Sequence, residues 1–428
     1  MSGSGLAHVS EILAAELLPP TANCDAAGRV AVGGVALSGL AERLGTPAIV
    51  LDELGLRATA REYVSALSAH HGQVDVHFAF KAFPAPGVAA VFASEGLGCD
   101  VVGANELALA MRGGMQADRI LVHGNAKTDE DIRAALDVGV GLVVVDSLDD
   151  LDRLERLAGQ RQHLLLRINP EVGAATHEAM ATGHAASKFG VPLEQAAEAI
   201  RRIGAHPLLE LDGLHSHVGS QILELDPFVA AVEPLGRYGS FGTYDIGGGL
   251  GVRYTLDDPA PPSFASYAQA LLAAVHRHLG VGCTVIAEPG RALVARSGVL
   301  LYRVVGVKRT RQHTFVAVDG GMGDNLEPML YGQRFEPLID AAGDRALERC
   351  EVVGRHCESG DRLVGTQLLA APRVGDLLVL PVAGAYCYTM GNNYNGALRP
   401  PVVLVADGLE QTIVRRETLD DLLDRHVA

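Results

Sequence analysis

Between residues 74 and 288 the sequence repeats a short apolar, β-branched run followed by a segment rich in Ala, Leu and Glu with helical spacing. The runs expected to form strands number eight and cover residues 74–80, 97–102, 119–124, 141–146, 163–168, 209–218, 243–247 and 283–288. Helices are expected at residues 87–95, 105–112, 129–138, 148–157, 193–203 and 264–278. Eight buried strands alternating with helices predict a (β/α)8 barrel of the TIM type, with an open doubly wound sheet as the alternative.

After about residue 291 the pattern changes to strand-like runs separated by turn residues. These runs cover residues 299–307, 314–319, 350–354, 376–382, 401–406 and 411–416. We therefore expect an α/β protein with a barrel over residues 51–291 and a β-rich domain over residues 292–428. The N-terminal segment, residues 1–50, fits neither a barrel turn nor a linker, and we expect it to supply an outer strand to the β domain.

The net charge of −16 argues against nucleic acid and anionic membranes as partners and favours a small molecule. No apolar run approaches the roughly 18 residues that span a bilayer. The N-terminus carries acids where a signal peptide needs basic and then apolar residues. We therefore expect a cytoplasmic protein. The six cysteines show no CxxC spacing, so neither a disulfide framework nor a zinc site is indicated, and we expect no bound metal.

In a barrel the chemically active groups lie at the C-terminal ends of the strands, so the residues that end each run are informative. Lys81 ends the first run, directly after Phe78, Ala79 and Phe80. Apolar neighbours desolvate an amine, lower its pKa and favour the neutral form that attacks an aldehyde. The alternative is a lysine whose stem packs on the strand while its amine reaches water.

The sixth run ends in HSHVGSQI, with His215 and His217 two residues apart and Ser220 just beyond. Histidines at this spacing can ligate a metal, but the motif holds no acidic partner. The competing use is an imidazole stacked on a ring, followed by donors for an anion. The seventh run ends in YDIGGGLG, where Gly248 and Gly249 allow the backbone to approach a phosphate, although tight turns also use glycines.

The eighth run ends in AEPGR, which directs Glu288 into the barrel mouth with Arg291 behind it. A carboxylate there can hold a pyridine nitrogen protonated, which pyridoxal-phosphate chemistry requires. A Glu-Arg pair alone can equally be a structural ion pair. Ring- or anion-compatible groups at four strand ends together favour a cofactor site.

Six motifs in order, FAFKA, HSHVGSQI, DIGGGLG, EPGR, HCESGD and GAYCY, resemble the alanine-racemase-like (fold type III) pyridoxal-phosphate-dependent decarboxylases. The resemblance is closest to diaminopimelate decarboxylases of the actinobacterial type and runs from about residue 45 to the C-terminal RRETLDDLL. It implies a barrel joined to a β-sandwich or Greek-key domain built from both chain ends. It also implies pyridoxal 5'-phosphate as cofactor and removal of an amino acid's α-carboxylate, with L-lysine as the product if meso-diaminopimelate is the substrate.

The resemblance also implies residue roles. Lys81 carries the cofactor, His217 stacks on its ring and Glu288 meets its ring nitrogen. The other cofactor-binding positions that match are Arg167, Ser220, Gly248, Gly249, Gly290, Arg291 and Tyr386. The matching substrate-binding positions are Arg291, Glu327, Tyr331, Glu358 and Tyr386.

Cys357 and Glu358, in HCESGD, match a loop that crosses a two-fold interface in the similar enzymes. There its cysteine protonates the substrate carbon after carbon dioxide leaves. The resemblance therefore implies a homodimer with shared active sites. The alternatives on the same fold are a non-catalytic cofactor-binding homologue and a racemase. Retention of Lys81, Glu288 and Cys357 argues against the first, and the CESGD loop argues against the second.

One position departs from the resemblance. Glu327, in DNLEPMLYG, stands where an arginine is expected to clamp the substrate's distal carboxylate. Opposite charge turns that attraction into repulsion. The segment after Tyr386, TMGNNYN, lacks a second expected arginine. Two hypotheses stay open. The substrate has a neutral or cationic far end, as in a specialised secondary-metabolite pathway, or Arg334 or Arg311 supplies the clamp.

Overall fold

The computed structural model describes residues 15–172 and 187–427 of the chain. The chain divides into two compact units, each with its own sheet system. The barrel unit comprises residues 57–252 and 260–293, and the β unit comprises residues 1–56, 253–259 and 294–428. The first 14 residues of the N-terminal segment lie outside the described part of the chain.

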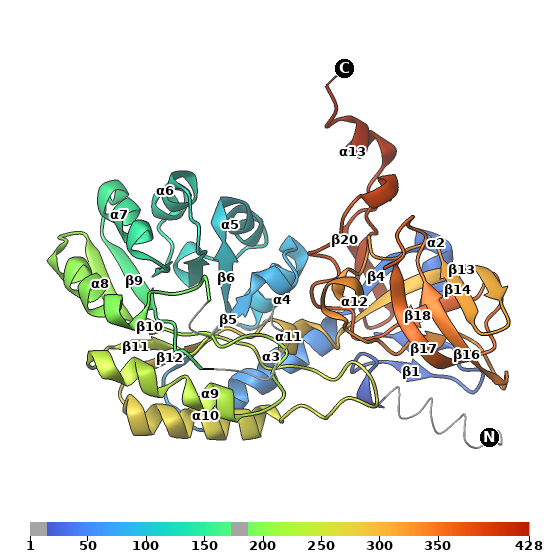
Figure 1. The fold of residues 1–428 in the computed structure, drawn as a ribbon, viewed down its shortest axis with the longest axis horizontal. Helices are drawn as coiled ribbons and strands as arrows, with labels where there is room; N and C mark the ends of the chain where they lie inside the picture. Colours follow the sequence, from blue (N-terminus) through green and yellow to red (C-terminus); the bar gives the residue numbers. More distant parts are fainter. Residues whose placement is uncertain (1–14, 173–186, 428) are drawn as a thin grey trace. The chain divides into compact units, whose positions relative to one another are not determined.

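In the described part of the barrel unit, eight parallel strands close into a barrel (Figure 1). Each strand pairs with the next along the chain, and β12 pairs with β5 to complete the ring. The predicted (β/α)8 barrel is confirmed, because a closed ring excludes an open doubly wound sheet. The strands are β5 (Val74–Ala79), β6 (Gly98–Val102), β7 (Ile120–His123), β8 (Leu142–Val145), β9 (Gln162–Arg167), β10 (Leu209–His215), β11 (Thr243–Asp245) and β12 (Thr284–Ala287).

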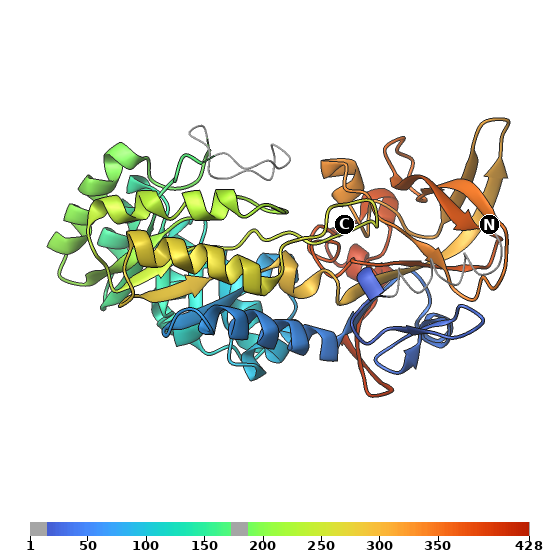
Figure 2. The same ribbon diagram turned by 90° about the horizontal axis from the view of Figure 1, so that it is seen from below.

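Helices cover the outside of the barrel, and residues at their ends explain where they begin and stop. The side chains and backbone N–H groups of Thr128 and Asp131 form a reciprocal capping box that begins α6, and Gly139, with φ of 68°, ends it. Helices α3 and α10 lie side by side (Figure 2), where the rings of Tyr63 and Phe264 are 5.1 Å apart. The helices lying wholly or mostly in this unit are α3 (Glu53–Ser68), α4 (Pro86–Ser94), α5 (Gly103–Arg112), α6 (Asp129–Val138), α7 (Leu148–Leu157), α8 (Leu193–Ala205), α9 (Asp226–Ala230), α10 (Phe264–His278) and α11 (Arg291–Val294), with 3-10 turns η1 (Phe80–Ala82), η2 (Ala117–Arg119) and η4 (Glu233–Tyr238).

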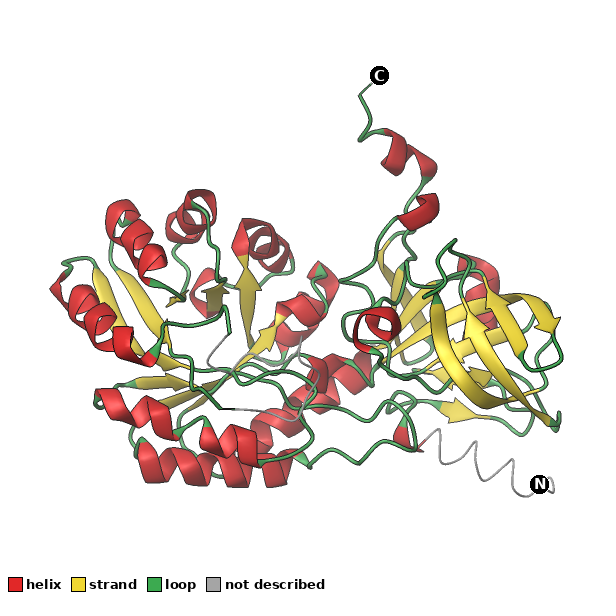
Figure 3. Ribbon diagram, viewed as in Figure 1, coloured by secondary structure: helices red, strands yellow, loops and turns green. Residues whose placement is uncertain are grey.

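The β unit consists mainly of strands (Figure 3). Its main sheet has the order β17-β16-β14-β13-β4-β19-β20, and β18 pairs with both β13 and β15. The expected β-rich domain is therefore confirmed. Its elements are β1 (Asn23–Cys24), β2 (Val30–Val32), β3 (Val35–Ala36), α2 (Leu37–Leu44), β4 (Ala48–Asp52), β13 (Gly298–Arg309), β14 (Thr314–Val318), α12 (Glu327–Tyr331), β15 (Leu338–Ile339), β16 (Leu347–Val353), β17 (Arg362–Ala370), β18 (Leu377–Leu380), η5 (Tyr394–Gly396), β19 (Val402–Ala406), β20 (Leu409–Val414) and α13 (Leu419–Leu423).

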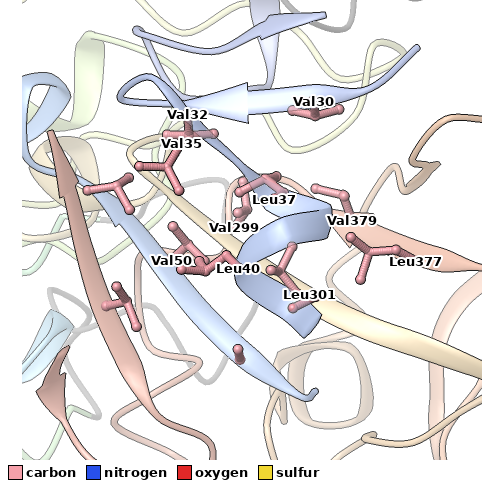
Figure 4. Packing of buried hydrophobic residues seen from close by; sticks show 14 of the residues in the cluster. Val30, Val32, Val35, Leu37, Leu40, Val50, Val299, Leu301, Leu377 and Val379 are labelled. Atoms are coloured by element: carbon pink, nitrogen blue, oxygen red, sulfur yellow. The ribbon is translucent and has the colours of Figure 1, made fainter. Parts of the chain in front are cut away.

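The position of β4 corrects the expectation of an outer strand from the N-terminal segment. β4 lies inside the sheet, antiparallel to β13 and parallel to β19. All five of its residues are buried, and an apolar run without alternation is typical of a central strand. Val50 packs in a core cluster with Leu37, Leu301 and Val379 (Figure 4). This segment therefore forms part of the core of the β unit and is not an addition to its edge.

Sequence inspection missed β17. Its residues do not alternate between buried and exposed positions, and Gly365 interrupts the strand. The pairing of β17 with β16 shifts register after Cys350. The strand forms because β16 supplies a hydrogen-bonding partner, which the local sequence does not show.

Candidate active site

Lys81 lies in η1, two residues beyond Ala79, the last paired residue of β5. The flanking side chains of Phe80 and Ala82 are fully buried, but the Lys81 side chain is 45% exposed. The aromatic neighbours therefore fix the backbone at this strand end without desolvating the amine, which corrects the desolvation argument made from the sequence. Lys81 Nζ lies 3.9 Å from Asp100 Oδ2 on the adjacent strand β6.

Asp100 is buried at the end of the barrel that holds Lys81. Burial raises the pKa of this carboxyl, and the positive charge of Lys81 partly offsets that effect. Neither carboxylate oxygen has a hydrogen-bond partner among the described residues. The strand-end pattern could have revealed Asp100, because it lies in the second predicted strand, but a single acid in an apolar run gave no distinct signal.

His217 follows β10, and its Nδ1 accepts a hydrogen bond from Gly248 N at 3.2 Å. Burial, and then the charges of Lys81 and Arg167, hold the pKa of His217 well below its usual range. The ring is thus a neutral imidazole with its proton on Nε2. His215, two residues earlier, faces Glu288 instead. The two histidines therefore do not share one ligand position.

The glycine triplet packs tightly against two neighbouring loops. A Cβ at Gly248 would lie 2.0 Å from Glu288 O, and one at Gly249 would lie 2.3 Å from Gly219 O. Gly249 also has φ of 117°, which side chains rarely adopt. These close approaches bring together the loops that follow β10, β11 and β12. They explain the glycines structurally, while the contact of Gly248, Gly249 and Ser220 with a phosphate stays a prediction.

The EPGR turn packs onto the end of β5 beside Lys81. Pro289 O accepts a hydrogen bond from Ala79 N at 3.1 Å, and a Cβ at Gly290 would lie 3.0 Å from that of Ala79. Arg291, at the start of α11, is 5% exposed. Lys81, Glu288, Gly290 and Arg291 are therefore brought to the same end of the barrel.

Arg167 ends β9 and is buried. Its Nη1 lies 3.4 Å from Asp146 Oδ2, and its guanidinium carbon lies 4.6 Å from the centre of the Phe189 ring. Burial lowers the pKa of Arg167, with Asp146 and Glu288 opposing that effect. The arginine is held as a cation that faces the same barrel interior as Glu288.

Glu288 lies in a buried quartet with His123, His215 and Asp245. His123 Nε2 lies 2.5 Å from Glu288 Oε1, and His215 Nε2 lies 3.3 Å from Oε2. Burial favours a higher pKa for Glu288, but the two imidazoles outweigh it and hold the pKa well below the usual range. Burial, followed by the charge of Glu288, raises the pKa of Asp245 well above its usual range. Glu288 is therefore the ionised carboxyl and Asp245 the protonated one.

Two imidazoles and two carboxyls within 4.8 Å of one another form a donor set that can suit a transition metal. Ligands on a tetrahedral zinc with bonds of 2.0–2.1 Å stand roughly 3.3 Å apart. The 2.5 Å separation between His123 and Glu288 is that of a hydrogen bond. The quartet is therefore a hydrogen-bonded cluster. Sequence inspection missed His123 and Asp245, although each lies within a predicted strand; they are the last residues of the observed strands β7 and β11.

The predicted residues of the β unit lie in loops that are joined by hydrogen bonds. Cys357 is exposed, and its backbone N–H donates to Asn395 Oδ1 at 2.8 Å. Asp361, which ends the HCESGD motif, accepts from the N–H groups of His356 and Met322 at 2.9 and 2.7 Å. The loop that carries Cys357 and Glu358 is thus tied to the segment after β14 and to the segment after Tyr386.

Glu327 is 1% exposed at the start of α12, and Tyr254 Oη donates to its Oε2 at 3.4 Å. Tyr331 ends the same helix, and Tyr386 has a left-handed backbone with φ of 64°. Arg334 pairs with Asp258 at 2.7 Å. Arg311 lies in the turn between β13 and β14, before β14 begins. The segment that leads to Glu327 follows the other end of that strand. That either arginine supplies the clamp stays a prediction.

Comparison with known proteins identifies the family. Residues 56–295 match the family described as pyridoxal-dependent decarboxylase, pyridoxal binding domain. The chain is 45% identical to the diaminopimelate decarboxylase of Actinosynnema pretiosum subsp. auranticum, over 94% of this chain and 93% of that protein. This chain belongs to the diaminopimelate decarboxylase family. It is also 37% identical to the diaminopimelate decarboxylase of Mycobacterium tuberculosis, over 97% and 98% of the two chains.

The fold agrees with solved structures of this family. Diaminopimelate decarboxylase from M. jannaschii in complex with L-lysine matches with a TM-score of 0.90 at 29% identity, over 96% of this chain and 98% of that one. The predicted resemblance is confirmed, as is the class of enzyme, a pyridoxal-phosphate-dependent carboxy-lyase. Across the described residues, no helix is long and apolar enough to cross a membrane.

The residues at the barrel mouth fit pyridoxal 5'-phosphate, the cofactor of the decarboxylase family. Asp100, buried without a hydrogen-bond partner among the described residues, lies 3.9 Å from the Lys81 amine. Glu288 is an ionised acceptor for a protonated ring nitrogen. The neutral imidazole of His217 and the glycine-rich turns lie at neighbouring strand ends. An amine, a flat ring and an anionic acceptor are the groups that this cofactor needs.

Proposed function

We propose that this decarboxylase converts meso-diaminopimelate to L-lysine and carbon dioxide, in lysine biosynthesis. The main support is similarity over nearly the whole chain to proteins named diaminopimelate decarboxylase, at up to 45% identity among those compared. The co-location of Lys81 and Glu288 at one end of the barrel supports the same chemistry. Experimentally, the purified enzyme should release carbon dioxide from meso-diaminopimelate and form lysine.

The proposed roles follow from the chemistry of each side chain. When bound, pyridoxal phosphate accepts the electron pair left behind as the substrate's α-carboxylate departs. Lys81 would hold the cofactor, and its amine would move protons during the reaction. Glu288 accepts a hydrogen bond from the ring nitrogen, and His217 packs on the ring. The anion-binding groups are proposed to be Arg167, Ser220, Gly248, Gly249, Gly290, Arg291 and Tyr386.

We propose that the enzyme acts as a cytoplasmic homodimer, with residues 51–291 as the cofactor-binding domain. The exposed thiol of Cys357 donates a proton to the substrate carbon after decarboxylation, and Glu358 contacts the substrate. Support comes from the exposure of Cys357 and from the hydrogen bond that fixes its backbone to Asn395. Size-exclusion chromatography with light scattering tests the dimer, and a monomer with full activity would contradict it.

A second candidate is decarboxylation of an amino acid with a neutral or cationic far end. One observation favours it: Glu327 is a buried acid hydrogen-bonded to Tyr254, and Arg334 is already paired with Asp258. A distal carboxylate would then meet an acid where a cation is expected. Arg291, Tyr331 and Tyr386 would still contact the rest of the substrate.

One assay separates these candidates. Carbon dioxide release is measured with meso-diaminopimelate and with a panel of lysine, ornithine, arginine and neutral amino acids. Lysine formation at ordinary enzyme rates from meso-diaminopimelate alone supports the first candidate and removes the Glu327 argument. Turnover of another amino acid with little diaminopimelate activity supports the second, and Glu327→Arg should then raise diaminopimelate activity. Racemisation, or cofactor binding without carbon dioxide release, would contradict both.

A further inference from the structure

The carboxylate of Glu288 is held from two sides of the barrel. His215 ends β10, which lies two strands from β12 in one direction around the ring, and His123 ends β7, three strands away in the other. Each imidazole reaches a different oxygen, at 3.3 Å and 2.5 Å. A carboxylate that accepts one hydrogen bond at each oxygen from opposite sides cannot rotate without losing one of them.

The two rings also fix each other. The centroids of His123 and His215 lie 5.0 Å apart in an edge-to-face arrangement. His215 is 1% exposed, and its Nδ1 has no hydrogen-bond partner among the described residues. A proton on Nδ1 would be a buried donor without an acceptor, so His215 donates from Nε2 as a neutral ring. Burial, which outweighs the effect of Glu288, lowers the pKa of His215 to about 4 and agrees with this assignment.

We propose that His123 and His215 are positioning residues, which orient Glu288 and keep it ionised so that it holds a proton on the cofactor's ring nitrogen. The inference rests on the proposed function and extends it to two residues that contact Glu288 and to which no cofactor or substrate contact is assigned. His215, as a neutral donor, stabilises the negative charge of Glu288 without cancelling it. Asp245, as the protonated neighbour, adds no second negative charge.

Other ionisable groups also face Glu288, and the test must separate their effects. They are Asp100, Arg167, Asp245 and His217. Their side chains are all retained in variants of His123 or His215, but the pKa of Asp100 also depends on His123 and that of His217 on His215. The glutamine variants, which keep an N–H donor but not the imidazole, therefore separate the effect of the two donors from these indirect effects.

The experiment uses two substitutions at each histidine in the full-length holoenzyme. Leucine removes the donor at similar volume, and glutamine restores an N–H at a similar distance from the Cα. His71→Leu is the matched control. His71 is also a buried histidine of the barrel unit, and its Nε2 donates to Cys283 O at 2.7 Å. Cys283 precedes β12, so this contact lies at the end of the strand opposite to Glu288. The readouts are the pH titration of the bound cofactor's absorbance, the cofactor dissociation constant, kcat and KM, and the melting temperature.

We expect His123→Leu and His215→Leu to lower kcat about tenfold or more while KM changes little. Losing a donor to the ionised form raises the pKa of Glu288. The acid transition of the cofactor's absorbance should therefore move to higher pH by roughly one unit. The glutamine variants should regain most of kcat and the wild-type transition, and His71→Leu should lower only the melting temperature.

Two results would overturn the inference. One is leucine variants whose titration and kcat match the wild type. The other is glutamine variants that fail as badly as the leucine variants, because shape rather than the donor would then matter. A wild-type enzyme that binds no cofactor contradicts the proposed function and, with it, this inference. A wild-type enzyme that is active, together with leucine variants of unchanged kcat and titration, contradicts the inference alone.

Discussion

Replacing Lys127 by methionine removes the cation of a buried ion pair in the barrel unit. Lys127 Nζ lies 2.7 Å from Asp150 Oδ2, and the two side chains are 1% and 5% exposed. The ammonium also donates to Gly124 O and Val144 O, each at 2.7 Å. It thus joins the end of β7, the strand β8 and the first turn of α7.

The substitution leaves Asp150 as a buried acid without its ammonium partner and two carbonyls without a donor. Breaking a buried pair by removing one partner costs about 3–5 kcal/mol. For a unit of this size, each kcal/mol lowers the melting temperature by about 2–4 °C, so a decrease of roughly 6–20 °C is expected. Lys127→Met combined with Asp150→Asn should recover part of that loss, because no unpaired charge then remains and the amide can still accept from Asp146 N.

Thermal unfolding followed by circular dichroism measures these changes, with the cofactor-saturated protein at one fixed concentration. Lys308→Met is the control, since Lys308 is exposed and its loss should change the melting temperature by no more than a degree or so. The reasoning is refuted by a Lys127→Met protein that melts within about 2 °C of the wild type. A double variant that is no more stable than the single one would also contradict it.

The other predictions concern the proposed site and the pH dependence of the β unit. Lys81→Ala should abolish the visible absorbance of the bound cofactor, and an unchanged spectrum would place the covalent attachment elsewhere. Cys357→Ala should bind the cofactor normally but turn over more slowly, so full activity would remove this thiol from the reaction. Burial, opposed by the Gly321 N–H, raises the pKa of Asp324 to about 7. Between about pH 4 and 7 the folded protein therefore binds more protons than the unfolded chain. The free energy of unfolding should fall as pH rises through that window. Asp324→Asn should flatten this fall in pH-dependent melting curves, and an identical slope in the variant would refute the assignment.

The strands and several helices could be read from the sequence because their signals are local. Barrel strands are covered on both faces, so they appear as continuous apolar runs. Helices α6, α7 and α10 begin where the sequence predicts, because the side chains of Thr128, Ser147 and Ser263 cap them. β4 and β17 show the limit of local patterns, since the position of a strand in a sheet depends on its partners.

The candidate site was predictable only in part for the same reason. Lys81 and Glu288 end apolar runs, which marks them without knowledge of the fold. The donors to Glu288 have no such local signal. His123 is separated from Glu288 by 165 residues along the chain and lies on another side of the barrel. Likewise, the hydrogen bond between Cys357 N and Asn395 joins loops 38 residues apart. No spacing rule connects residues that only the closed barrel or the folded loops bring together.

Three of the buried acids at the barrel mouth show why those missing partners matter for function. Asp100, Asp245 and Glu288 are all 5% exposed or less, so burial alone would protonate each of them. It does raise the pKa of Asp100 and Asp245. Glu288 alone has an imidazole donor at each oxygen, and its pKa is lowered instead. Of these three acids, Glu288 alone has a pKa that its neighbours lower, so the histidines, more than the acids themselves, determine which carboxyl can pair with a protonated ring nitrogen.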